Sequence, residues 1–304
     1  MVPVRGGDRD TAPALRAIGA AARAAGARFV VVDNGIVPVA RDGLAGTGAE
    51  VVPCATVGSY AARNAGVAAA LRERPDAILF TDADCRPGPD WPAHLLDLLH
   101  RADVVTATAA PRADRPLGAG AAADYRDRLA AWSGGAVCCG EPVNTMDTRA
   151  AAVRADLFRD RGFDTRLRFA GDAVFGRTAR AAGARVVGCH HAVLSHDPPR
   201  SWSGELRKYR HIAASLVDDL RAIPRREVLR LLPEHAHLLL PPPPSAVAGA
   251  RERLARAVRA FDRTDPGRAT SLYRAVRELG WTLGWARRHG ERAGTAPLLD
   301  QPRR

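Results

Sequence analysis

The segment Ala77–Trp91 (AILFTDADCRPGPDW) places two carboxylates directly after an apolar run. Asp82 and Asp84 are one residue apart, and side chains at i and i+2 of an extended chain point to the same side. Two unpaired carboxylates placed in this way repel each other, which raises the pKa of one of them. A divalent cation removes the conflict, because Mg²⁺ and Mn²⁺ prefer oxygen ligands and Mg²⁺ often bridges carboxylates and substrate phosphates. The pair therefore suits a metal–diphosphate site, although a turn also explains an isolated Asp-X-Asp.

Strand-like and helix-like segments alternate along the first 110 residues and would position this pair. Strands are expected at Met1–Val4, Arg28–Val32, Glu50–Cys54, Ala77–Thr81 and Asp103–Thr108. Helices are expected at Ala12–Ala25, Ser59–Glu73 and Trp91–Arg101. Continuous apolar strands separated by helices predict an α/β fold with a mostly parallel sheet, and such sheets bind ligands at the carboxyl ends of their strands. Asp33 ends the second strand, so its carboxylate should lie on the same rim as Asp82 and Asp84.

The pattern weakens between residues 112 and 150, where we expect loops and one helix. A second αβ unit follows, with a helix at Gly171–Ala182 and a strand at Arg185–Gly188. Beyond residue 199 the chain is predicted to be helical, with an interruption at the prolines 241–244.

Composition and cysteine usage narrow the class of protein. The 304 residues are 46% hydrophobic, which is enough for a sizeable core. The first ten residues contain no apolar segment, so we expect no signal peptide and a cytoplasmic protein. The five cysteines include no CxxC pair, which is typical of reduced thiols. The CHH at 189–191 lacks a second ligand cluster at zinc-finger spacing, so we do not interpret it as a metal site.

Basic residues concentrate in the C-terminal third. Residues 200–304 carry 21 basic and 11 acidic residues, a net of +10 out of the total of +12. Leu272, Val276, Leu279 and Leu283 form one stripe of a predicted helix, and Trp281 and Trp285 lie on the opposite side among arginines. Either the tryptophans cover another helix, or they dock the helix on an anionic membrane at the inner face of the plasma membrane. We do not expect a nucleic-acid partner.

Several sequence blocks, in this order and at this spacing, resemble the family 2 glycosyltransferases with the GT-A fold. The blocks are GSYAARNAGVAAA (58–70), TDADCRPGPDW (81–91), AAVRADLFRDRGFDTRLRFAGDAVFGRTARAAGARV (151–186) and VLSHDPPRSW (193–202). The resemblance covers residues 1–215 and implies a catalytic domain with a nucleotide-sugar-binding half (1–110) and an acceptor-binding half (111–215). Residues 216–304 fall outside it and are expected to form a basic helical extension.

The resemblance implies an inverting, metal-dependent transfer of a sugar from a UDP-, GDP- or dTDP-sugar to an acceptor hydroxyl. It places the donor nucleotide at Pro3, Arg5, Asp33, Arg63 and Asp82. It places Mn²⁺ or Mg²⁺ at Asp82 and Asp84, with His196 completing the metal or diphosphate site. Arg63 could instead be a surface arginine of its helix, and His196 a simple loop histidine.

Asp172 matches the general base of the family, which accepts the proton of the acceptor hydroxyl as that oxygen attacks the anomeric carbon. A carboxylate at a helix start could equally be an N-cap. The chain also departs from the family in two places. Arg5 stands where an aromatic residue often stacks on the nucleotide base, and Gly171 precedes Asp172 where the family frequently has a glutamate.

Other classes of function explain less of the sequence. A nucleotidyltransferase that makes sugar nucleotides requires a Gly-rich N-terminal loop, and VPVRGGDRD matches such a loop only weakly. A non-catalytic scaffold with a degenerate transferase domain, binding membranes or nucleic acid, would show salt-sensitive binding without turnover. A dehydrogenase is not expected, because no GxGxxG follows the first strand.

Overall fold

A computed structural model describes residues 1–5, 11–35, 41–111, 140–143, 145–196, 201–261 and 265–290. The chain forms two compact units. The described residues of the first unit lie within 1–111 and 140–196, and those of the second lie within 201–290. The boundary expected at residue 215 would cut the helix α7 (Trp202–Ala222), whereas the structure divides the chain before this helix begins.

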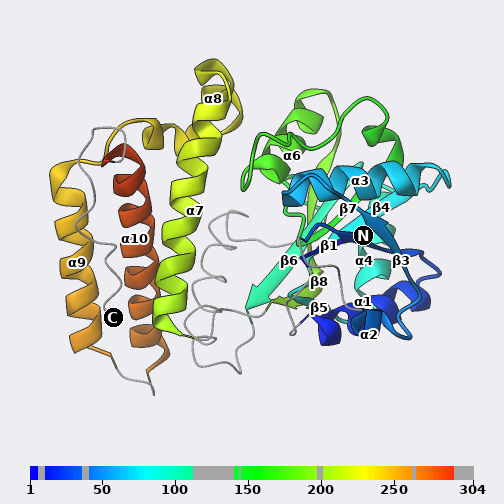
Figure 1. Ribbon diagram of the computed structural model, residues 1–304, viewed down its shortest axis with the longest axis horizontal. Coiled ribbons are helices and arrows are strands. Elements are labelled where there is room, and N and C mark those ends of the chain that lie inside the picture. Colours follow the sequence, from blue (N-terminus) through cyan, green and yellow to red (C-terminus); the bar gives the residue numbers. More distant parts are fainter. Residues whose placement is uncertain are drawn as a thin grey trace. The chain divides into compact units, whose positions relative to one another are not determined.

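The first unit opens with three parallel strands, as expected from the sequence. They are β1 (Val2–Val4), β2 (Phe29–Asp33) and β3 (Ala49–Pro53), in the order β1-β2-β3. The neighbouring helices are α1 (Ala12–Ala24), α2 (Arg41–Leu44) and α3 (Ser59–Leu71). Strand β2 is buried on both faces because its side chains alternate: Val31 packs with α1, and Val32 packs with α3. The two helices therefore cover opposite faces of this sheet (Figure 1).

Apolar burial fixes α1 on its face. Leu15 is fully buried and Ile18 is 3% exposed, and both pack in one cluster with Val2 and Val31. Burying a side chain of this size contributes about 1.5–3 kcal/mol to folding.

A second sheet has five strands in the order β4-β7-β6-β8-β5. Their bounds are β4 Ala77–Thr81, β5 Cys85–Pro87, β6 Val104–Pro111, β7 Ala150–Arg154 and β8 Val186–His196. Strands β6 and β8 are parallel, whereas β7 is antiparallel to both β4 and β6. Met1, which precedes β1, donates from its amino terminus to the Leu79 carbonyl and accepts from the Thr81 N–H, so the start of β1 lies beside β4.

The sequence did not predict β5 and β7, and it predicted only the first residues of β8. The remaining helices of this unit are α4 (Trp91–Leu99), the 3₁₀ helix η1 (Ala155–Phe158) and α6 (Gly171–Ala181). The α/β fold class expected from the sequence, with parallel strands flanked by helices, is confirmed, although β4, β5 and β7 pair antiparallel with their neighbours in the second sheet.

The entry into α3 depends on a glycine with unusual backbone geometry. Gly58 has φ +132°, a region that favours glycine, and its N–H donates to Asn34 Oδ1 over 3.0 Å. Asn34 follows β2 directly, so this contact ties the start of α3 to the end of β2. At Gly66 a Cβ would come within 2.7 Å of Val32, so glycine also lets α3 lie close to the sheet.

The second unit is helical, as expected. It contains α7 (Trp202–Ala222), α8 (Arg225–Leu231), the 3₁₀ helix η2 (Pro233–Leu239), α9 (Pro244–Arg259) and α10 (Pro266–Gly290). Helices α7 and α10 pack closely at Gly280, which has no side chain: a Cβ there would lie only 2.6 Å from the Leu206 carbonyl oxygen. Between them the Tyr273 hydroxyl donates to the buried Glu205 over 2.6 Å. In the described part of the chain, none of the helices has the length and apolar character needed to span a bilayer.

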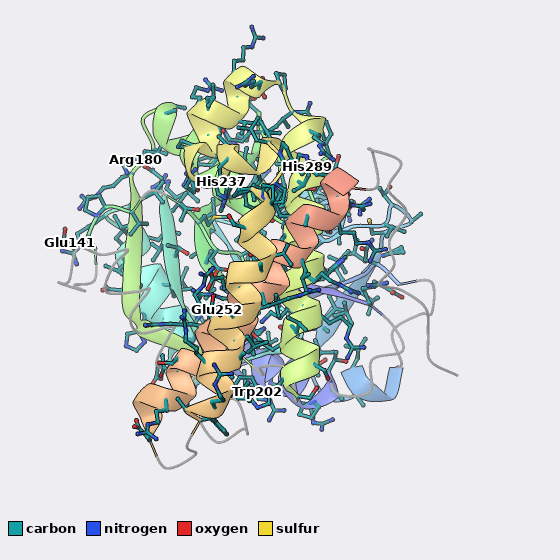
Figure 2. The ribbon with its side chains drawn as sticks, turned by 90° about the vertical axis from the view of Figure 1, so that its left-hand side faces the viewer. Glu141, Arg180, Trp202, His237, Glu252 and His289 are labelled. Carbon is teal, nitrogen blue, oxygen red and sulfur yellow. The ribbon has the colours of Figure 1, made fainter. Side chains whose placement is uncertain are left out.

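The predicted apolar stripe of α10 is confirmed, because Leu272, Val276 and Leu279 are buried. The tryptophans on the other side pack within the unit. Trp285 Nε1 donates to the Leu240 carbonyl over 2.7 Å, and its ring meets His237 edge-on at 5.4 Å between centroids. Figure 2 labels His237, which lies in η2.

Candidate active site

The two carboxylates that follow β4 have different partners. Asp82 Oδ1 accepts from Arg63 Nη2 over 2.5 Å, and the Arg63 side chain is 4% exposed. Asp84 Oδ2 lies 3.1 Å from His196 Nε2, and 57% of its side chain is exposed. His196 is the last residue of β8, and its register partner Cys85 begins β5. The antiparallel pairing of these two strands therefore brings His196 to the acidic pair.

These partners separate the pKa values of the two aspartates. Burial raises the pKa of the Asp82 carboxyl, and the charge of Asp84 adds to this although Arg63 opposes it. Burial also acts to raise the pKa of Asp84, but the hydrogen bond and charge of His196 outweigh it and leave that pKa below its ordinary value. One member of the pair thus has a raised pKa, but burial contributes more to it than the repulsion between neighbours from which the sequence predicted it.

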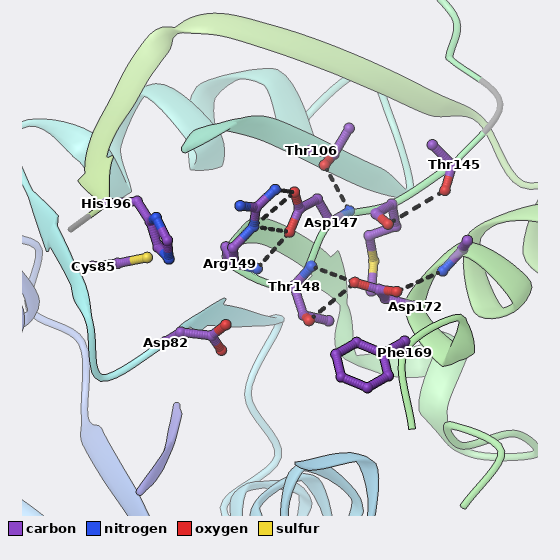
Figure 3. A network of polar contacts seen from close by, with 12 residues as sticks. Asp82, Cys85, Thr106, Thr145, Asp147, Thr148, Arg149, Phe169, Asp172 and His196 are labelled. Carbon is purple, nitrogen blue, oxygen red and sulfur yellow. Dashed lines mark hydrogen bonds and ion pairs between the residues drawn. The ribbon is translucent and has the colours of Figure 1, made fainter. Parts of the chain in front are cut away.

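Asp172 lies in the first turn of α6, where the helix dipole favours an ionised carboxylate. It is not the N-cap, because Ala170 holds that position. Its Oδ1 lies 2.9 Å from the Tyr60 hydroxyl. Its Oδ2 accepts from the Thr148 backbone N–H over 3.2 Å and lies 3.3 Å from the Thr148 hydroxyl (Figure 3). Its Oδ1 also accepts from the Ala173 N–H over 2.9 Å, so four donors contact the carboxylate.

The pKa of Asp172 is raised, chiefly by burial and then by the charge of Asp147, although Arg63 and the bonds from Thr148 and Tyr60 act in the opposite direction. A buried carboxylate with a raised pKa is a better proton acceptor than one in water. Burial and the carboxylate of Asp172 both raise the pKa of Tyr60, so the phenol stays protonated and donates.

Helix α3 connects the two ends of the site. Tyr60, Arg63 and Asn64 are spaced i, i+3 and i+4 and therefore lie on one face of the helix. Tyr60 reaches Asp172 and Arg63 reaches Asp82. The Asn64 side chain donates to the Phe163 carbonyl over 2.8 Å and accepts from the Phe163 N–H over 2.9 Å. The ARNAG block is thus bonded to the RGFD block, although the two lie about a hundred residues apart.

The remaining residues predicted for the donor site lie on the neighbouring strands β1 and β2. Pro3 is the register partner of Val32, and Asp33 is the partner of Val4 and of Pro53. The Asp33 carboxylate accepts from the Gly35 N–H over 3.3 Å. Arg5 follows β1 and is exposed. Asp33 ends its strand as the sequence predicted.

Comparisons with solved structures find proteins of the same fold, although no protein-family model and no curated protein matches the sequence. A mannosyltransferase from Pyrobaculum calidifontis, in complex with GDP-Man and Mn²⁺, superposes with a TM-score of 0.61 at 20% identity, over 94% of this chain and 84% of the other. TarS of S. aureus (residues 1–349), in complex with UDP-GlcNAc, gives 0.51 at 13% identity over 96% and 90%. Glucosyl-3-phosphoglycerate synthase from Mycobacterium tuberculosis gives 0.50 at 16% over 73% and 79%.

The chain has the GT-A fold. At identities of 13–20% the likeness shows the fold alone. Within the described part of this GT-A fold, no group of three or more His, Cys, Asp and Glu residues is arranged as a complete metal site by itself. Asp84 and His196 nevertheless present carboxylate and imidazole donors in contact, with Asp82 two residues away. The carboxylates suit Mn²⁺ or Mg²⁺ when a ligand's phosphates supply further oxygens, whereas an imidazole donor is more typical of transition metals than of Mg²⁺.

Besides Tyr60, the structure adds three consecutive residues to the GT-A site that the sequence did not single out, Asp147, Thr148 and Arg149. Asp147 and Arg149 form a bidentate ion pair beside Thr148, with Nε at 3.0 Å from both carboxylate oxygens. Although burial opposes it, Arg149 holds the pKa of Asp147 below its ordinary value. Figure 3 shows this pair next to the contact between Thr148 and Asp172. The only signal in the sequence was a short run of polar residues, DTR (147–149), before an apolar run.

Proposed function

We propose that this protein is a metal-dependent, inverting glycosyltransferase that moves a sugar from a nucleotide-sugar donor to a hydroxyl of an acceptor. One observation carries the proposal. A single face of α3 is bonded both to the Asp82 side of a candidate metal–diphosphate site and to a buried carboxylate, Asp172, with a raised pKa. The solved neighbours in complex with GDP-Man and with UDP-GlcNAc support a nucleotide-sugar as the donor.

The donor would lie along the carboxyl ends of the parallel strands. Pro3, Arg5 and Asp33 would contact the nucleoside, and Arg63 would act there through its ion pair with Asp82. Asp82, Asp84 and His196 would hold Mn²⁺ or Mg²⁺ together with the diphosphate. When bound, the metal supplies positive charge that stabilises the departing nucleoside diphosphate.

Asp172 would act on the acceptor. Its carboxylate would take the proton of the acceptor hydroxyl as the oxygen attacks the anomeric carbon from the face opposite the leaving group. One displacement of this kind inverts the configuration and needs no covalent intermediate on the enzyme. The Thr148 N–H and the Tyr60 hydroxyl fix the carboxylate before the acceptor arrives, which favours reaction from an aligned complex.

A thermal-shift screen of nucleoside diphosphates and sugar nucleotides, with and without Mn²⁺, tests the donor and metal site. We expect a rise in Tm that needs both nucleotide and metal, because a ligand that binds only the folded state stabilises it. Asp84→Ala should abolish the rise, since it removes a metal donor and the partner of His196.

Asp97→Ala, at an exposed aspartate of α4, is the matched control and should keep the wild-type shift. A shift that Asp84→Ala leaves unchanged, or no shift with any nucleotide, would contradict the proposal.

A membrane contact, if the protein makes one, would involve α8 and Leu240, the residue after η2. Trp285 is engaged within the unit, but Leu229 is 55% exposed and Leu240 is 61% exposed. Leu229 is flanked on α8 by the exposed residues Arg225, Arg226 and Arg230. We propose that this surface contacts anionic lipid headgroups and brings the enzyme to a lipid-linked acceptor.

Co-sedimentation with vesicles that contain phosphatidylserine tests this contact. The protein should pellet with them at low salt and be released as the salt concentration rises, whereas neutral phosphatidylcholine vesicles should leave it in solution. Leu229→Glu should weaken the binding, because it adds a like charge at the lipid surface. The hypothesis fails if the wild-type protein does not bind at low salt.

A further inference from the structure

Tyr60 is buried next to the candidate site. It is 3% exposed, and its ring stacks on Phe163 with 5.6 Å between centroids and 24° between planes. The Arg63 guanidinium carbon lies 5.5 Å from the ring centroid. These contacts leave the hydroxyl as the polar end of a fixed ring, aimed at Asp172.

The hydroxyl has one proton and two acceptors. It lies 2.9 Å from Asp172 Oδ1 and 3.0 Å from the Phe169 carbonyl oxygen. A hydrogen bond to an ionised carboxylate is stronger than one to a neutral carbonyl. The proton therefore points to Asp172 while that carboxylate is charged. Once Asp172 is protonated, the carbonyl of Phe169 can accept the bond instead.

Gly171 makes the space that the ring occupies. A Cβ at this position would meet three carbons of the Tyr60 ring at 2.6, 2.7 and 2.9 Å, closer than real Cβ contacts come. A residue with a side chain at 171 would have to push the ring away, and with it the hydroxyl. The glycine that replaces the usual glutamate before Asp172 is thus matched to Tyr60.

We propose that Tyr60 is a positioning residue for Asp172, and that Gly171 is required because it admits the Tyr60 ring beside the base. This inference rests on the proposed function, since it assigns Tyr60 a role in the reaction for which Asp172 is the base. Its effect is to favour the ionised carboxylate and to fix its orientation.

The pH profile of Tyr60→Phe tests the role of the hydroxyl. The variant keeps the ring and removes the donor. The hydrogen bond from Tyr60 stabilises the ionised form of Asp172. Without that bond the carboxylate is easier to protonate, so the pKa of Asp172 rises. Because a general base must be ionised, the acid limb of kcat should move to higher pH, by about one unit. Activity below the limb should fall about tenfold, and KM for the donor should change less than twofold.

Two further variants accompany this test. Tyr209→Phe removes a hydroxyl that lies 3.3 Å from that of Tyr273 in the second unit, and it should keep the wild-type profile. Gly171→Ala should displace the ring and lower kcat at every pH, with a smaller effect in the Tyr60→Ala background, where the ring is absent.

The titration of Asp172 followed by carboxyl ¹³C NMR gives a readout that does not need turnover. In Tyr60→Phe the Asp172 midpoint should move upward relative to the wild type. Equal midpoints in the two proteins would overturn the inference while leaving the transferase proposal intact. Gly171→Ala with wild-type kcat would overturn the part that concerns glycine. A wild-type protein without transfer activity would instead count against the proposed function.

Discussion

Asp172→Asn should lower kcat for sugar transfer about 10²- to 10⁴-fold, the usual range for loss of a general base. Asparagine can still accept from the Thr148 N–H, so the first turn of α6 should keep its structure. It cannot take the proton of an acceptor hydroxyl, because the amide is a very weak base. The measurement is the steady-state rate of nucleoside diphosphate release with and without acceptor, with the donor KM determined alongside.

The donor KM should change little, because Asp172 is proposed to act on the acceptor. Asp164→Asn is the control: this aspartate is bonded to Arg166 at the surface of the first unit, and its loss should leave kcat unchanged. If Asp172→Asn retains more than a tenth of the wild-type kcat, another group takes the proton and the assignment of the base is wrong.

Arg63→Ala should lower the free energy of unfolding by about 3 kcal/mol, because removing one partner of a buried ion pair leaves the other charge without compensation. The Arg63 side chain is 4% exposed and that of Asp82 is 28% exposed, so we expect the lower end of the usual range. The pKa of Asp82, already raised by burial, should rise further without Arg63. Urea unfolding gives the stability, and loss of the Mn²⁺-dependent thermal shift gives the effect on the site.

Arg166→Ala is the matched control. It breaks an Arg–Asp pair of similar length, 2.6 Å, but its arginine is 54% exposed, so the loss should be below about 1 kcal/mol. A double-mutant cycle of Arg63→Ala with Asp82→Ala should give a coupling energy above that of the exposed pair. Equal losses in Arg63→Ala and Arg166→Ala would show that the Asp82 contact contributes no more than a surface ion pair.

The elements that could be predicted from the sequence were those with a continuous apolar run or a regular helical spacing of apolar residues. Strands β1 to β4 and helices α1, α3 and α4 agree with their expected ranges within a few residues. Strand β7 escaped prediction because its sequence, AAAVR, is mostly alanine, which favours strands weakly. It is a strand because it is buried between β4 and β6, which local sequence does not reveal. The helix expected between residues 112 and 150 falls largely outside the described residues.

Some residues of the candidate site could likewise be predicted from the sequence, and others could not. Asp82, Asp84 and Asp172 could be found from spacing and from the resemblance. Tyr60, one of the partners of Asp172, could not be found in this way. It lies 112 residues away in the chain, and the helical pattern of α3 marks its position only as a buried one. Gly171 was visible only as a departure from the family, and its physical reason appears once the Tyr60 ring is in place.

Helix α3 makes the donor end and the acceptor end of the site parts of one rigid body. Arg63 and Tyr60 are one turn apart, so a displacement of the helix by a diphosphate bound at the proposed donor site would be transmitted to the hydroxyl that contacts Asp172. Donor occupancy and proton affinity of the base would then be thermodynamically linked, and the linkage must be reciprocal. If Asp172 is the base, as proposed, binding of the donor would change its proton affinity before an acceptor arrives, through Arg63 and Tyr60 on one helix.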